Sequence, residues 1–99
     1  MTKLSIIIPC FNEERTIEEI VSRVERAPLP SGWEKEIVLV DDFSTDGTRG
    51  KIEKYFPKHI IILRRENGGK GAAVKNGLER ATGDFIIIQD ADLEYEPND

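Results

Sequence analysis

The chain has 99 residues, of which 38% are hydrophobic and 33% are charged, and its formal net charge at pH 7 is −5. This length suits one small domain or one piece of a larger one, and the balance of apolar and charged residues excludes an intrinsically disordered chain. The acidic surplus excludes a general nucleic-acid-binding protein, because such proteins need a basic surface to displace counterions.

The chain begins with a predicted strand and an amphipathic helix. Leu4–Ile8 is a nearly continuous apolar run, which is typical of a parallel strand that is covered on both faces. Glu13–Arg26 then predicts a helix with Asn12 as its N-cap, and two prolines prevent it from continuing. Its apolar residues recur at the i, i+3, i+4, i+7 spacing of one stripe, at Ile17, Ile20, Val21 and Val24.

A second strand and a short helix are predicted next. Glu36–Val40 repeats the buried apolar pattern of the first strand. The helix after it is expected to be capped by Ser44 or Asp46 and to end before Pro57. Its residues facing the sheet would be Ile52 and either Tyr55 or Phe56.

The last predicted elements are a strand at Ile60–Leu63, a helix from about Lys70 to Ala81, and a strand at Phe85–Ile88. Gly83 suits the position just after that helix, where a left-handed residue often ends it. Five helix residues are expected to face the sheet: Ala73, Val74, Gly77, Leu78 and Ala81.

Strands alternating with helices predict an α/β fold, namely a Rossmann-like parallel sheet in strand order 3-2-1-4 with helices on both faces. The chain ends shortly after its fourth strand, where a further crossover is expected, so residues 1–99 are interpreted as a domain truncated at its C-terminus. Such a fragment leaves apolar surface uncovered, and we therefore expect self-association.

Polar segments follow all four predicted strands, at residues 9–13, 41–46, 64–71 and 89–94. In an open parallel sheet, ligands gather beyond the carboxyl ends of the strands. The four segments should therefore converge on one edge of the sheet, and this convergence predicts a binding site there.

The sharpest motif in these segments is the D-x-D sequence of Asp90 and Asp92. Two carboxylates at a strand end form a hard-oxygen site for Mg²⁺ or Mn²⁺, and such a metal would also bind a diphosphate. Glu94 is close enough in sequence to join the metal ligands. The alternative is that the acidic loop is only a turn or a helix cap.

Two further segments point to a nucleotide. An acidic residue at Asp41 or Asp42, after the second strand, commonly accepts hydrogen bonds from a ribose or base, although one of the two could simply turn the chain. Glycines in the segment 67–71 would let backbone amides approach a phosphate, but Asn-Gly-Gly is also ordinary turn chemistry. Phe11 is suited either to stacking on a base or to packing in the core.

The order of four motifs, at residues 4–13, 37–48, 67–73 and 81–97, resembles the start of family-2 glycosyltransferases. The polyprenyl-phosphate type, such as dolichol-phosphate mannosyltransferases, is the most similar in these motifs. The resemblance implies the N-terminal half of a GT-A fold that binds a UDP- or GDP-sugar with Mg²⁺ or Mn²⁺. It also implies an inverting sugar transfer, with a polyprenyl phosphate at the cytoplasmic face of the membrane as one acceptor.

The resemblance also implies roles for individual residues. Those at the nucleotide would be Pro9, Phe11 and Glu13 near the nucleoside, Asp42 with Asp41 beside it at the base or ribose, and Lys70. Asp90 and Asp92 would hold the metal, with Glu94 at a position where the lipid-phosphate type often has Gln. The acceptor site of the family lies C-terminal to the D-x-D segment, so no catalytic base is assigned in this chain.

The remaining observations concern the cellular compartment and the alternative functions. A single cysteine, Cys10, cannot form an intrachain disulfide, which favours a reducing, cytoplasmic compartment. The main alternative function is a nucleotide-binding module without catalytic activity of its own. A response-regulator-like domain fits less well, because it needs an aspartate after its third strand and this chain has Arg64 there.

Overall fold

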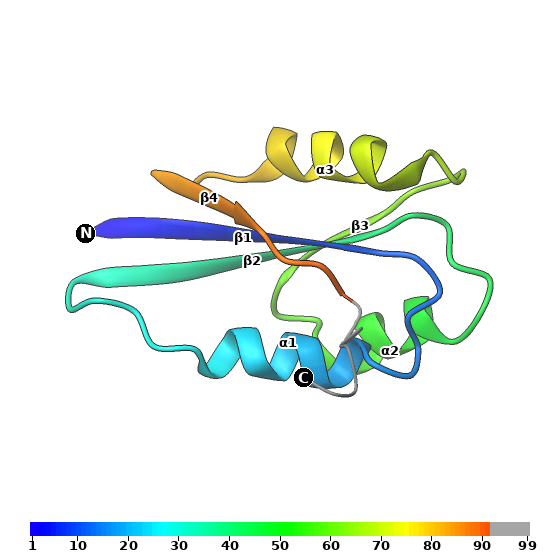
Figure 1. Ribbon diagram of the computed structural model, residues 1–99, viewed down its shortest axis with the longest axis horizontal. Coiled ribbons are helices and arrows are strands. Elements are labelled where there is room, and N and C mark those ends of the chain that lie inside the picture. Colours follow the sequence, from blue (N-terminus) through cyan, green and yellow to red (C-terminus); the bar gives the residue numbers. More distant parts are fainter. Residues whose placement is uncertain (92–99) are drawn as a thin grey trace, which may run out of the picture.

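The computed structural model describes residues 1–91, which form a four-stranded sheet flanked by three helices (Figure 1). Every neighbouring pair of strands is parallel, and the order across the sheet is β3-β2-β1-β4. This arrangement confirms the predicted sheet. The elements follow one another as β1 (Thr2–Cys10), α1 (Ile17–Arg26), β2 (Trp33–Asp41), α2 (Thr48–Tyr55), β3 (Ile60–Leu63), α3 (Gly69–Arg80) and β4 (Phe85–Ile88).

The register of the strands brings their carboxyl ends to one edge of the sheet. Cys10 at the end of β1 pairs with Asp41 at the end of β2, and Asp41 pairs in turn with Leu63 at the end of β3. On the other side of β1, Ile7 pairs with Ile88, the last residue of β4. The strands β1, β2 and β3 therefore end at the same level, and β4 ends on the same edge at the level of Ile7, three residues before the end of β1.

Helices cover both faces of the sheet, as predicted, with α1 and α2 on one face and α3 on the other (Figure 1). Residues alternate along a strand, so Ile6 and Ile8 of β1 pack on the α1 side while Ile7 packs on the α3 side. The predicted stripe of α1 is fully buried at Ile17, Ile20, Val21 and Val24.

The helix α3 contacts the sheet through its smallest residues. A Cβ atom placed on Gly77 would lie 2.6 Å from Cγ2 of Ile7. The side chain of Ile7 in β1 therefore packs directly against the backbone of α3 at Gly77. Ala73, one turn earlier, is also buried. Leu78 was expected to face the sheet but is 46% exposed, because the Ala73–Gly77 line forms the contact and Leu78 lies about 100° around the helix from it.

The predicted cap of α1 was wrong. The helix begins at Ile17, four residues later than expected, and Asn12 adopts a left-handed conformation with φ of 53°. Its side-chain oxygen accepts hydrogen bonds from the amides of Thr45 (2.8 Å) and Asp46 (3.3 Å). Asn12 therefore joins the loop after β1 to the loop after β2, since both loops leave the same edge of the sheet.

The expected caps of the other helices also differ in position. Asp46 accepts the amide hydrogen of Thr48 at 2.9 Å, but the N-cap residue of α2 is Gly47. Gly83 lies beyond the C-cap of α3, which is Ala81, and its role is a close approach to β1. A Cβ atom on Gly83 would lie 2.7 Å from the backbone nitrogen of Ser5.

The strand β4 was expected to be covered on both faces, and this expectation was wrong. Its four residues, Phe85 to Ile88, are 40% to 56% exposed. Within residues 1–91 the strand pairs only with β1, and none of its residues belongs to either core cluster. An apolar strand thus forms one edge of the described sheet.

Candidate functional site

A pocket of about 250 Å³ lies at the carboxyl edge of the sheet and receives residues from the segments that follow all four strands. Six residues singled out in the sequence line it: Pro9, Phe11, Glu13, Asp42, Lys70 and Asp90. Sequence reasoning did not assign a binding role to Cys10 or Asn67, which also line it. Asn67 was detectable as the first residue of the Asn-Gly-Gly turn. Asp92 and Glu94, the other predicted metal ligands, lie outside the described residues.

The carboxylate of Asp42 is almost fully buried and is held by the loop that precedes α3. Its Oδ1 accepts hydrogen bonds from Nε of Arg64 (2.7 Å) and the amide of Gly68 (3.0 Å), and its Oδ2 accepts one from the amide of Gly69 (2.8 Å). Negative charge is favourable at a helix N-terminus, where amides lack partners within the helix. Asp42 thus stabilises the start of α3.

These contacts change the interpretation of the glycine segment. The sequence suggested that the amides of this segment approach a phosphate, but those of Gly68 and Gly69 already donate to Asp42. A carboxylate offers about four acceptor positions, and Asp42 uses three of them for Arg64 and the two glycines. One acceptor position of this carboxylate remains, and Asp42 lines the pocket.

Asp41 serves the turn instead of the pocket. Its side chain is completely buried, and Oδ2 accepts hydrogen bonds from the Ser44 amide (3.0 Å) and from Nε of Arg49 (2.7 Å). Arg49 also donates to the carbonyl of Arg64 at 2.5 Å. The structure therefore separates the adjacent aspartates: Asp41 organises the loop after β2, and Asp42 lies at the pocket.

Lys70 and Asp90 both line the pocket and contact each other. The Nζ of Lys70 forms an ion pair with Oδ1 of Asp90, and the two side chains are 60% and 59% exposed. The amide of Gln89, just before Asp90, donates to the carbonyl of Ile7 at 2.8 Å. After Asp90, the buried Ala91 accepts a hydrogen bond from Oγ1 of Thr16 at 2.9 Å. The backbone on both sides of Asp90 is therefore fixed.

The chemistry of this position fits a hard divalent cation. Asp90 presents a solvent-accessible carboxylate at the end of β4, and Mg²⁺ and Mn²⁺ prefer carboxylate oxygens together with phosphate oxygens. Among residues 1–91 no group of three or more histidine, cysteine, aspartate or glutamate side chains is arranged to hold a metal. Asp90 is the only one of the three predicted metal ligands within that range.

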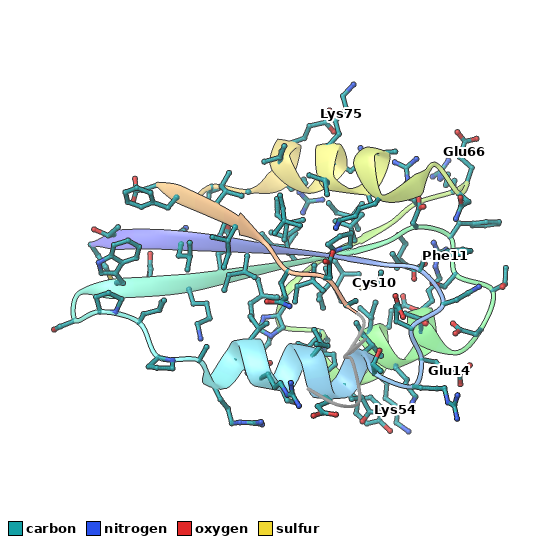
Figure 2. The ribbon with its side chains drawn as sticks, in the orientation of Figure 1. Cys10, Phe11, Glu14, Lys54, Glu66 and Lys75 are labelled. Carbon is teal, nitrogen blue, oxygen red and sulfur yellow. The ribbon has the colours of Figure 1, made fainter. Side chains whose placement is uncertain are left out.

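Cys10 contributes a buried and unreactive thiol to the wall of the pocket. Phe11 lies beyond the end of β1 (Figure 2). It is partly exposed, whereas Cys10 is buried. Burial raises the pKa of the Cys10 thiol, and the nearby carboxylates of Asp41 and Glu13 raise it further. The thiol donates to the carbonyl of Ile8 at 3.3 Å. It stays protonated near neutral pH and is therefore part of the wall, not a nucleophile.

Comparison with known proteins shows the sequence family of the chain. Residues 5–99 match the sequence family described as Glycosyl transferase family 2. A dolichol-phosphate mannosyltransferase from Pyrococcus furiosus is 39% identical over 97 residues, which are 96% of this chain and 27% of that protein.

Two solved structures share the fold over most of the chain. S. aureus TarS 1–349 in complex with UDP superposes with a TM-score of 0.79 and 35% identity, over 92% of this chain and 28% of that one. The mannosyltransferase PcManGT from Pyrobaculum calidifontis, in complex with GDP-Man and Mn²⁺, has a TM-score of 0.73 and 32% identity, over 90% of this chain and 27% of that one. The chain thus spans little more than a quarter of the length of each of these three relatives.

Proposed function

We propose that this chain, which belongs to glycosyl transferase family 2, forms the donor-binding part of a glycosyltransferase. The donor is a nucleotide-diphosphate sugar, bound with a divalent metal in the pocket at the carboxyl edge of the sheet. The observation that carries the proposal is the pocket itself, because the segments after all four strands supply residues to it. A merely structural set of loops has no need to gather an aromatic ring, a lysine and three acidic side chains around one hollow.

Each described pocket residue has a proposed task. Asp42 accepts a hydrogen bond from the base or ribose with its remaining acceptor capacity, and Pro9 in β1 and Glu13 in the loop after it border the nucleoside. The partly exposed ring of Phe11 stacks on the base. The ammonium group of Lys70, near the N-terminus of α3, attracts the diphosphate.

Asp90, together with Asp92 and Glu94, is proposed to hold Mg²⁺ or Mn²⁺ beside the diphosphate. A metal bound there would neutralise negative charge on the nucleoside diphosphate as the bond between the sugar and that group breaks. The fixed backbone around Asp90 places its carboxylate at the pocket before any ligand arrives. The solved PcManGT complex, with GDP-Man and Mn²⁺, supports this choice of ligands.

We also propose an acceptor for the sugar and a place in the cell for the reaction. The similarity to a dolichol-phosphate mannosyltransferase supports a polyprenyl phosphate as acceptor. We propose the cytoplasmic face of a membrane as the place of reaction. None of the helices within residues 1–91 has the length and apolar character needed to cross a bilayer. We propose that residues 1–99 supply the donor and metal half of the site, with the acceptor half in further sequence.

Calorimetric titration tests the donor site directly. UDP and GDP are titrated into the wild-type chain with Mn²⁺ and then with a chelator, and the titrations are repeated for Asp90→Asn and Asp92→Asn. Each substitution should remove most of the metal-dependent affinity, about 2 kcal/mol or roughly thirtyfold, because a charged ligand is lost.

Asp84→Asn is the matched control, since Asp84 lies exposed at the opposite end of β4 and accepts a hydrogen bond from the Lys3 amide. It should leave the affinity unchanged. The proposal is wrong if neither nucleotide binds, or if the wild type binds equally well with and without metal. A chain that binds both ligands but transfers no sugar to any acceptor fits a donor half-site.

A further inference from the structure

The contact between Lys70 and Asp90 joins two groups to which the proposed function gives different partners, namely the diphosphate and the metal. We propose that Lys70 is an exchangeable counter-ion: its ammonium group occupies the carboxylate of Asp90 until a nucleotide binds, and then moves to the diphosphate. Lys70 thereby makes metal binding depend on the nucleotide. This inference rests on the proposed metal site at Asp90.

The two backbones are fixed while the lysine side chain is not. Lys70 is the second residue of α3, directly after Gly69, whose amide is held by Asp42 at 2.8 Å. Asp90 is fixed by the contacts of Gln89 and Ala91 described above. The ammonium group, in contrast, ends a flexible four-carbon stem in a side chain that is 60% exposed. Exchange between two partners therefore requires only rotation of the lysine side chain.

The ion pair is weak enough for Lys70 to compete with a metal ion for Asp90 without preventing the metal from binding. Exposed ion pairs contribute about 0–1 kcal/mol, so Lys70 weakens cation binding at Asp90 by at most roughly fivefold. A divalent cation carries twice the charge of the ammonium group and uses the same carboxylate oxygens. The metal can displace Lys70, but it binds better once an anion has drawn the lysine away.

A bound diphosphate changes this competition. Its negative charges attract the ammonium group, which releases the carboxylate of Asp90, and its oxygens add ligands for the metal. Lys70 consequently has opposite effects on the two ligands. It opposes the metal when no nucleotide is present, and it favours the nucleotide. A residue with a purely structural role would weaken both.

Substitution of Lys70 by glutamine tests whether Lys70 weakens metal binding and strengthens nucleotide binding. Mn²⁺ binding without nucleotide is measured from the electron paramagnetic resonance signal of the free ion, and UDP and GDP binding in saturating Mn²⁺ is measured by calorimetry. Lys70→Gln should tighten Mn²⁺ binding roughly two- to fivefold and should weaken nucleotide binding. The factor by which UDP strengthens Mn²⁺ binding should fall as well, because linkage is reciprocal.

The control is Lys75→Gln, which removes the same charge from the same helix. Lys75 is exposed and points away from the sheet (Figure 2). This variant should change neither affinity. In the double variant Lys70→Gln with Asp90→Asn, the gain in Mn²⁺ affinity should disappear.

The outcomes separate this inference from the proposed function. If Asp90→Asn abolishes Mn²⁺ binding while Lys70→Gln leaves it unchanged or weaker, the metal site stands and the exchange is wrong. If both lysine variants tighten Mn²⁺ binding equally, the effect is one of overall charge and the exchange is again wrong. If Asp90→Asn leaves Mn²⁺ binding unchanged, the proposed metal site itself is overturned.

Discussion

The carboxylate of Asp42 accepts a hydrogen bond at 2.8 Å from the amide of Gly69, which lies 27 residues further along the chain. One side chain therefore stabilises the first turn of α3 and also lines the pocket. Lys70 follows Gly69 directly, so this contact fixes the backbone from which the lysine side chain extends. The fold and the candidate site are coupled through a single carboxylate.

Replacing Asp42 by asparagine should reduce both stability and nucleotide affinity. The substitution keeps the shape of the side chain but leaves Arg64 without its charged partner at 2.7 Å, which should cost about 1–3 kcal/mol of unfolding free energy. Urea unfolding measures the loss of stability, and UDP titration measures the loss of nucleotide affinity. Glu66→Gln is the control, since Glu66 is exposed on the same loop and should tolerate the change.

Two glycines of α3 should respond to alanine with opposite signs. Gly77→Ala brings a Cβ atom to 2.6 Å from Ile7, and the overpacking should outweigh the gain in helix propensity for a net loss of about 1–2 kcal/mol. Gly71→Ala places its Cβ in open space and should stabilise the protein by about 0.5–1 kcal/mol. Urea midpoints that shift in the same direction for both variants would contradict the packing of α3 on β1.

The carboxylate of Glu36 should make stability depend on pH in the acid range. Burial by itself raises its pKa, but hydrogen bonds from Ser5 (2.6 Å) and from Thr82 (2.8 and 2.7 Å) outweigh this and hold the pKa below its ordinary value of 4.5. A lowered pKa in the folded state gives stability that is present above pH 4.5 and is lost as pH falls through the lower folded value.

Glu36→Gln should therefore be less stable than the wild type at pH 7, and the difference should narrow at pH 3. Unfolding free energies at the two pH values measure this. If the difference stayed constant or grew as the pH fell, the hydrogen bonds from Ser5 and Thr82 would not be what lowers the pKa of Glu36.

The exposed strand β4 should cause self-association. An apolar strand with an open edge exposes both unpaired backbone groups and side chains to a second copy. We expect the sedimentation coefficient to rise with protein concentration.

Ile87→Lys should weaken the association roughly tenfold by removing one buried isoleucine from the contact. Leu78→Lys is the control, because Leu78 is equally exposed, at 46% against 47%, but lies on α3. A monomer at all concentrations would speak against this surface.

The sequence by itself determined the type and order of the elements. Apolar runs such as Glu36–Val40 and the stripe from Ile17 to Val24 depend only on neighbours within a few residues. Short crossovers between parallel strands then allow few arrangements, and the expected order 3-2-1-4 is the observed one. The convergence of polar segments on one edge follows from that order, since the carboxyl ends of parallel strands share an edge.

Only the tertiary structure decided which partner each polar group has. Asp41 and Asp42 are equivalent in sequence, yet one is enclosed by Arg49 and the other by Arg64 and two glycine amides. Asn12 had the sequence of a helix cap, but two amides of the loop after β2 compete for its side chain.

Burial was decided in the same way. The residues of β4 are as apolar as those of β1, and they differ because Ile6, Ile7 and Ile8 of β1 pack in the two core clusters whereas no residue of β4 belongs to either. Hydrogen bonds and burial depend on groups that meet only after the chain has folded, often more than twenty residues apart in sequence. Local patterns do not carry that information, because they record what a segment prefers and not what lies beside it.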